Sequence, residues 1–274
     1  MPSDIAALPV STPPQVAPTL VPVVDPMHFE ASADTYAEAR PPYPAELWQR
    51  LRTLGLLRPG SRALDLGAGT GQATGPLLGA GLHVTAIEPG PRLAGLLHAA
   101  HPAADVRLCR AEDMQFAASS FDLVVAATSI HWMNLDILLP NLYTILNSNG
   151  RFAVWRNVFG DPDAEPTPFR ARITEIVDAR RAPPRPGPPA EDLDATIEAL
   201  TASGLFRVTD ASTYRWTLEL DAAAIGRLFR TFSDWSAGEV EQAVAAVNEL
   251  GGIVTEHYSS WLVVLAPSEQ PPVP

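Results

Sequence analysis

The chain carries at residues 63–72 the stretch Ala63-Leu64-Asp65-Leu66-Gly67-Ala68-Gly69-Thr70-Gly71-Gln72. A short apolar run ends in an acid and is followed by glycines at alternate positions, which predicts a buried strand, a tight turn and the start of a helix. Glycine suits such a turn because it tolerates unusual dihedrals and lets a ligand approach the backbone. The helix would direct its free N–H groups and positive dipole end over the turn. We therefore expect a ligand site here, suited to an anionic group.

Strands and helices are expected to alternate around this stretch. Apolar runs predict strands at 62–66, 82–89, 106–109, 121–127 and 151–156, strand material in 206–220, and a closing strand at 257–266. Helical spacing of apolar residues predicts helices at 45–57, 72–80, 91–100, 136–146, 167–180, 191–203, 222–235 and 239–250. A strand, a helix and a second strand in this order form a right-handed βαβ unit, whose ligand edge lies at the carboxyl ends of the strands.

The length of 274 residues and the 46% hydrophobic composition suit one large domain with additions. Proline-rich composition predicts a poorly ordered leader at 1–26 and a tail at 267–274. Between them we place the main domain at 27–266, with an N-terminal lid and helices at 27–57. A proline-rich insertion at 157–190 is expected on the rim of the sheet, where substrate-shaping elements tend to lie.

Charge and cysteine content exclude several classes of partner. The 31 acidic and 19 basic residues give a net charge of −12, which opposes nucleic-acid binding and offers no polybasic membrane patch. The single cysteine, Cys109, cannot form an intrachain disulfide or a cysteine-based metal site. We find no apolar stretch as long as a membrane span and no signal peptide, so we expect a cytoplasmic protein without a metal, nucleic-acid or membrane partner.

Two ligand classes compete for a glycine turn after a first strand, dinucleotides and S-adenosylmethionine. The dinucleotide pattern G-x-G-x-x-G/A would place its third small residue at Gln72, which is neither glycine nor alanine. Asp65 instead suits a ligand with an ammonium group near the turn. A nicotinamide-dependent oxidoreductase remains the less favoured alternative, because the chain shows no Tyr-x-x-x-Lys pair or similar hydride-transfer site.

The order Asp65, glycine turn, Glu88 at the second strand end and an acidic loop at Glu112 resembles the class I S-adenosylmethionine-dependent methyltransferases. The resemblance extends from about Phe29 to Pro267 and is strongest from Arg62 to Trp155. It implies an α/β, Rossmann-like, seven-stranded and mostly parallel sheet with an antiparallel last strand and helices on both faces.

The resemblance also implies how the cofactor is held, with S-adenosyl-L-homocysteine as the product. In the family the glycine loop wraps the methionyl part, the acid ending the second strand binds both ribose hydroxyls, and the acidic loop borders adenine. Family members often carry aspartate before the Ala111-Glu112 pair, where this chain has Arg110. The implied cofactor-binding residues are Asp65, Gly67, Ala68, Gly69, Gly71, Glu88, Pro89, Ala111, Glu112 and Thr128.

A narrower likeness comes from Tyr36-Ala37-Glu38-Ala39-Arg40-Pro41-Pro42-Tyr43-Pro44 together with Ile130-His131-Trp132. The pair resembles the trans-aconitate methyltransferase group, whose members esterify carboxylates of small acids, and its relatives in natural-product pathways. It implies O-methylation of a carboxylate on a small-molecule or peptide acceptor. Methylation of a hydroxyl, phenol, nitrogen or carbon stays open, as does a protein that uses the cofactor without transferring the methyl group.

The acceptor-side candidates are Tyr36, Arg40, His131 and Trp132, of which the first three are the catalytic candidates. A short helix would place Tyr36 and Arg40 on one face, and Arg40 could donate two parallel hydrogen bonds to a carboxylate. His131 is the candidate base for a phenol or alcohol, whereas a carboxylate is already ionised and needs none. Each has a plainer alternative, Arg40 as a locally paired cation and His131 as a packing residue. His98 and His101 lie three apart, but no third metal ligand is evident, so we expect a solvated helix end.

Overall fold

A computed structural model describes residues 39–180, 191–232 and 234–269. The predicted leader at 1–26, Tyr36 and most of the predicted tail at 267–274 lie outside these residues. The glycine-rich stretch and the sheet around it are described in full.

The described strands form one seven-stranded sheet in the order β3-β2-β1-β4-β5-β7-β6. The strands are β1 (Arg62–Leu66), β2 (His83–Ile87), β3 (Asp105–Arg107), β4 (Phe121–Ala127), β5 (Leu146–Phe159), β6 (Phe206–Asp221) and β7 (Ile253–Pro267). Pairs among β1 to β5 are parallel, and β7 is antiparallel to both β5 and β6. The predicted fold class, mostly parallel with an antiparallel last strand, is confirmed.

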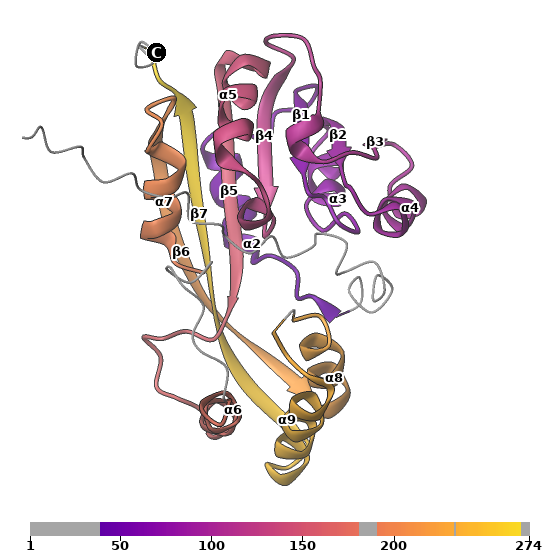
Figure 1. Cartoon of the computed structure of the whole chain (residues 1–274), viewed down its shortest axis with the longest axis vertical. Coiled ribbons are helices and arrows are strands. Elements are labelled where there is room, and N and C mark those ends of the chain that lie inside the picture. The colour runs from indigo at the N-terminus through magenta and orange to yellow at the C-terminus, as the bar shows by residue number, and fades with distance from the viewer. Residues whose placement is uncertain (1–38, 181–190, 233, 270–274) are drawn as a thin grey trace, which may run out of the picture.

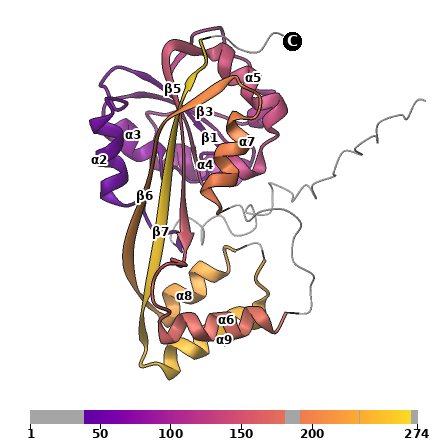
Figure 2. The same ribbon diagram turned by 90° about the vertical axis from the view of Figure 1, so that its left-hand side faces the viewer.

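Helices cover both faces of the parallel part of the sheet (Figures 1 and 2). They are α2 (Ala45–Thr53), α3 (Thr74–Gly79), α4 (Pro91–Ala100), α5 (Leu135–Ile145) and α7 (Leu193–Thr201). Along β4, Val124 packs in the layer with α5, and Val125 packs in the layer with α2 and α3. Successive side chains of a strand point to opposite faces, so both faces of β4 are apolar because both are covered.

The three last strands of the sheet continue well past the parallel part. β5, β6 and β7 have 14, 16 and 15 residues, and their far ends pair with one another alone. Around these ends lie α6 (Pro168–Asp178), α8 (Ala222–Phe229) and α9 (Ala237–Glu249), which we call the helical end (Figures 1 and 2). Its apolar core includes Phe169, Phe229 and Val247.

The helical end corrects three boundaries expected from the sequence. β5 runs on to Phe159 instead of ending at residue 156, because residues 157–159 pair with 258–260 of β7. β7 begins at Ile253 for the same reason, pairing with β6. The helix expected at 222–235 ends at Phe229. Helix α6 of the predicted insertion is therefore a component of this helical end, packed on α9 and β7.

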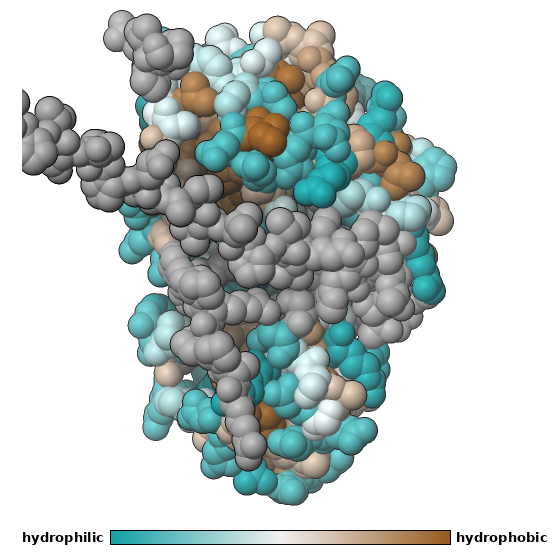
Figure 3. Space-filling view, in the orientation of Figure 1, coloured by the Kyte–Doolittle hydropathy of each residue, from teal (hydrophilic) through white to brown (hydrophobic). Residues whose placement is uncertain are grey.

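The described surface is largely polar. On the face shown in Figure 3, hydrophilic side chains cover most of the described surface at both ends, and apolar ones are scattered. Within residues 39–180, 191–232 and 234–269, no helix has the length and apolar character needed to cross a membrane.

Candidate active site

The glycine turn lies between β1 and α3 and has the strained backbone that the sequence predicts. Gly67, Gly69 and Gly71 have φ angles of 63°, 58° and 97°. Residues other than glycine rarely adopt this backbone conformation. A Cβ on Gly67 would lie 2.7 Å from the Cβ of Ser129. One on Gly71 would lie 2.5 Å from Cδ2 of His101. At these two positions the chain's own packing therefore requires glycine, besides any need of a ligand.

His101 corrects the expectation of a solvated helix end. It is the C-cap of α4, half-buried, and its ring lies over the glycine turn at Gly71 and over Gly75 in α3. Within the described part of the chain, no group of histidines, cysteines and carboxylates could hold a metal ion. His101 thus shapes the turn by packing.

Asp65 ends the buried core of β1 as a fully buried carboxylate. Thr74 Oγ1 donates a 2.6 Å hydrogen bond to Oδ2, while Oδ1 has no hydrogen-bond partner among the described residues. Burial first, and then the charge of Glu88, raise the pKa of Asp65 to about 6, and the hydrogen bond from Thr74 opposes this rise. A buried acceptor without a partner at a glycine turn fits the ammonium group of a ligand.

Glu88 follows β2 and fastens the turn to this strand. The N–H of Gly69 donates to Oε2 at 2.9 Å, and the N–H of Gly90 donates to Oε1 at 2.8 Å. The side chain is buried, so its two oxygens are fixed in place. A carboxylate oxygen can accept more than one hydrogen bond, so a carboxylate fixed in this way suits the vicinal hydroxyls of a ribose.

The turn after β3 holds the predicted adenine-side residues. Ala111 is buried in a 3-10 turn at Ala111–Asp113. The carboxylate of Glu112 accepts from the N–H of Asn134 at 2.7 Å, and its other oxygen lies 3.7 Å from Nε of Arg110. Glu112 therefore fastens this turn to the start of α5.

The end of β4 is a second strained point. Thr128 has a φ of 59°, unusual for a β-branched residue, and such outliers gather at functional sites. Its N–H donates to the carbonyl oxygen of Trp155 at 2.8 Å, and Ser129 Oγ donates to the carbonyl oxygen of Leu66 at 2.6 Å. The ends of β1, β4 and β5 are thus tied together beside the glycine turn.

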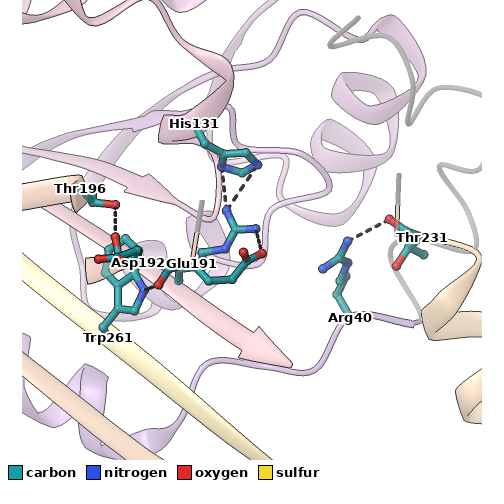
Figure 4. Close-up of polar contacts among 8 residues, drawn as sticks. Arg40, His131, Glu191, Asp192, Thr196, Thr231 and Trp261 are labelled. Atoms are coloured by element: carbon teal, nitrogen blue, oxygen red, sulfur yellow. Dashed lines mark hydrogen bonds and ion pairs between the residues drawn. The ribbon is translucent and has the colours of Figure 1, made fainter. Parts of the chain in front are cut away.

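His131 and Arg156 meet next to this point (Figure 4). His131 lies in a 3-10 turn after β4, and Arg156 belongs to β5. NH1 of Arg156 lies 2.9 Å from Nδ1 and 3.4 Å from Nε2 of His131, and NH2 donates to Oε1 of Glu191 at 2.8 Å. Because a guanidinium only donates, the ring nitrogen facing it accepts, and the proton of the neutral imidazole is on the other nitrogen.

The electrostatics around His131 oppose a positive charge on its ring. The pKa of His131 is lowered to about 2. The largest cause is loss of hydration of the imidazole, followed by the positive charges of Arg156 and Arg40. His131 as a whole residue is exposed, so water weakens the effect of burial on this pKa. Burial and the two cations act in the same direction, so the imidazole is neutral at pH 7 and is a weak base.

The two other described acceptor-side candidates have protein contacts. Arg40 donates to the carbonyl oxygen of Thr231 at 2.9 Å, and its guanidinium carbon lies 4.9 Å from the ring centre of Phe232. Arg40 therefore links the N-terminal segment to the chain after α8. Trp132 is half-buried, with its ring centre 4.7 Å from that of His131. Tyr36 lies outside the described residues.

Residues 64–154, which carry the glycine turn and the ends of β2, β3 and β4, match a family model described as a methyltransferase domain. Residues 64–154 therefore form a methyltransferase domain, and its motifs are similar to those of the class I S-adenosylmethionine-dependent methyltransferases. The family match favours the methyltransferase over the dinucleotide-binding alternative.

Curated relatives are also named as methyltransferases, and a solved structure shares the fold. An uncharacterized methyltransferase of Mycobacterium tuberculosis is 35% identical over 130 residues, 47% of this chain and 52% of the relative. A probable S-adenosylmethionine-dependent methyltransferase of Saccharomyces cerevisiae is 30% identical, over 44% of this chain and 43% of the relative. The chain thus spans about half the length of the curated relatives that it matches. The structure of a putative type II methyltransferase from Anaeromyxobacter dehalogenans shares the fold with a TM-score of 0.58 at 22% identity, covering 85% of this chain and 99% of that one.

Sequence reasoning does not single out Arg156 and Glu191 in this methyltransferase. Arg156 is the last position of the strand expected at 151–156, and the carboxyl ends of parallel strands are where ligands bind. That position is the signal that could have found it. Nothing in the local sequence indicates that Glu191 meets Arg156.

Proposed function

We propose that this methyltransferase transfers the methyl group of S-adenosylmethionine to a carboxylate oxygen of a small-molecule or peptide acceptor. The observation that carries the proposal is the contact between Arg156 and His131. It leaves the imidazole with one nitrogen accepting from a cation and the other protonated. His131 is thereby a poor general base, whereas a carboxylate acceptor is already ionised at neutral pH and needs none.

The cofactor supplies an electrophilic methyl group on a sulfonium. The chain's own residues then have to hold the acceptor in line and exclude water. Arg156 and Arg40 both lie close enough to His131 to lower its pKa, and their charges favour an anionic acceptor over a neutral one. Arg40, His131 and Trp132 are our described acceptor-side residues, and Tyr36 remains a further candidate.

The cofactor is proposed to bind along the turn and the ends of β2 to β4. Asp65 offers a buried oxygen without a hydrogen-bond partner among the described residues to the ammonium group, and the fixed carboxylate of Glu88 is proposed to accept from the ribose hydroxyls. The residues assigned to the remainder of the cofactor are Gly67, Ala68, Gly69, Gly71, Pro89, Ala111, Glu112 and Thr128. The protein is proposed to act in the cytoplasm as one domain at 27–266.

The proposal is tested by supplying labelled S-adenosylmethionine with panels of carboxylic acids, phenols, alcohols and amines. We expect products that gain one methyl group and lose it in mild alkali, since esters hydrolyse there while aryl ethers and methylamines do not. A matched Glu88→Ala variant should lose product with every acceptor. Alkali-stable products formed only from phenols or amines would contradict the proposal.

A further inference from the structure

The guanidinium of Arg156 lies against His131, just after the end of β4. Its side chain is 14% exposed, and its strand, β5, is paired on both sides, to β4 and β7. The contact of NH1 with His131 holds one side of the guanidinium. Arg156 is therefore a fixed cation beside the residues that tie β4 to the glycine turn.

Glu191 is the exposed partner of this ion pair. Its side chain is 45% exposed, whereas its backbone oxygen accepts from Trp261 Nε1 at 2.8 Å (Figure 4). Trp261 pairs with Arg156 in the register of β5 and β7, so the backbone of Glu191 is anchored next to Arg156. Exposed ion pairs contribute little stability. Only a side-chain rotation is needed to move the Glu191 carboxylate away from Arg156.

The carboxylate of Glu191 is held through a single oxygen. NH2 of Arg156 contacts Oε1, while NH1 is directed at His131. An acceptor carboxylate in the same position would be fixed by one oxygen and would keep the lone pairs of its second oxygen for attack. The guanidinium would also keep such an acid ionised, because an adjacent positive charge lowers the pKa of a carboxyl group.

We propose that Arg156 binds the carboxylate of the acceptor and that Glu191 occupies this position until the acceptor displaces it. Glu191 then acts as an internal competitor that sets the affinity for anionic acceptors. The inference rests on the proposed function, because it names the residue that recognises the acceptor of that reaction. It makes Arg156 a specificity-determining residue and Glu191 its regulator.

The test measures binding of acetate, succinate and citrate to the full chain saturated with S-adenosyl-L-homocysteine, at constant ionic strength. Glu191→Gln removes the competing charge, and we expect at least one of these carboxylates to bind about fivefold tighter. Glu198→Gln makes the same change of charge at an exposed residue of the next helix, α7, and should bind as the wild type does. Arg156→Gln should weaken binding at least tenfold, with Arg156→Lys between it and the wild type.

Two results would overturn the inference. One is a Glu191→Gln protein that binds carboxylates no tighter than Glu198→Gln does, which decides the matter even if Arg156→Gln fails to fold. The other is a folded Arg156→Gln protein with wild-type carboxylate affinity. Formation of methyl esters is measured separately. The expected binding pattern without any ester would uphold Arg156 as an anion site and refute the proposed reaction.

Discussion

Tyr43 and Thr128 meet through their hydroxyl oxygens at 3.1 Å, which joins the N-terminal Pro-Pro-Tyr-Pro segment to the strained end of β4. The ring of Tyr43 packs edge-on against Trp48 and Trp155, with ring centres 6.3 and 5.8 Å apart. Nearby, Asn157 Nδ2 donates to the carbonyl oxygens of Pro41 and Pro42, each at 3.3 Å. The segment before α2 is thus fastened to β4 and β5 beside the candidate active site.

Replacing Tyr43 separates the hydroxyl contact from the ring packing. Tyr43→Phe keeps the ring and removes one hydrogen bond, so the free energy of unfolding should fall by about 0.5–1.5 kcal/mol. Tyr43→Ala also removes the aromatic contacts and should cost about 2 kcal/mol or more. Chemical denaturation of both variants measures the difference. Equal losses would show that the ring contributes nothing.

Asp65 predicts a pH dependence of stability and of cofactor affinity. Its pKa is raised from 3.8 to about 6 in the folded protein, so the folded state binds the proton more tightly. The stabilising contribution of the protonated group is complete below pH 3.8 and is lost as the pH rises through about 6, at a cost of about 3 kcal/mol. Asp65→Asn should therefore flatten the stability profile of the ligand-free protein between pH 4 and 7.

The same carboxylate should make cofactor binding pH-dependent in the opposite sense. An ammonium group binds the ionised form of Asp65, so the affinity for S-adenosyl-L-homocysteine should rise as the pH passes through about 6. Calorimetry at a series of pH values measures this rise, and Asp65→Asn is the control that should lack it. A wild-type affinity that stays constant from pH 5 to 8 would argue against contact between Asp65 and the ammonium group.

The sequence predicts the strands and the glycine turn far better than the contacts around His131 and Arg40. β1 and β4 have the expected bounds, and the glycine turn and Glu88 lie where a strand, a turn and a second strand place them. These features depend on local patterns, apolar runs that end in an acid or a glycine. Local periodicity is sufficient there because the ends of neighbouring parallel strands meet at one edge.

The acceptor side depends on contacts that no local pattern specifies. Arg156 meets Glu191 35 positions away, and Arg40 meets the carbonyl oxygen of Thr231 191 positions away. The first contact arises because Trp261 of β7 holds the backbone of Glu191 next to Arg156. The second arises because β5, β6 and β7 are long and carry the helical end. The strand lengths are set by pairing among themselves, and their alternating residues do not reveal where pairing stops.

Glu88 predicts the strength of ribose recognition. Glu88→Ala removes both carboxylate oxygens and should weaken binding of S-adenosyl-L-homocysteine by about 1.5–3 kcal/mol. Glu88→Gln keeps one acceptor oxygen and should lose less. Glu198→Gln, at an exposed acid of α7, is the control and should bind normally. Calorimetry measures the loss of ribose contact. The free energy of unfolding, measured in parallel, reports the loss of the hydrogen bonds to Gly69 and Gly90.

His131 distinguishes a positioning role from base catalysis. His131→Gln keeps an oxygen that can accept from Arg156, so kcat with a carboxylate acceptor should fall no more than severalfold. A general base would cost about 10²–10⁴-fold on the same substitution. Because the pKa of His131 is lowered to about 2, kcat/KM of the wild type for the acceptor, at saturating cofactor, should also be level between pH 7 and 9. A rise of kcat/KM with pH in this range that disappears in His131→Gln would identify the imidazole as the base and would contradict the carboxylate proposal.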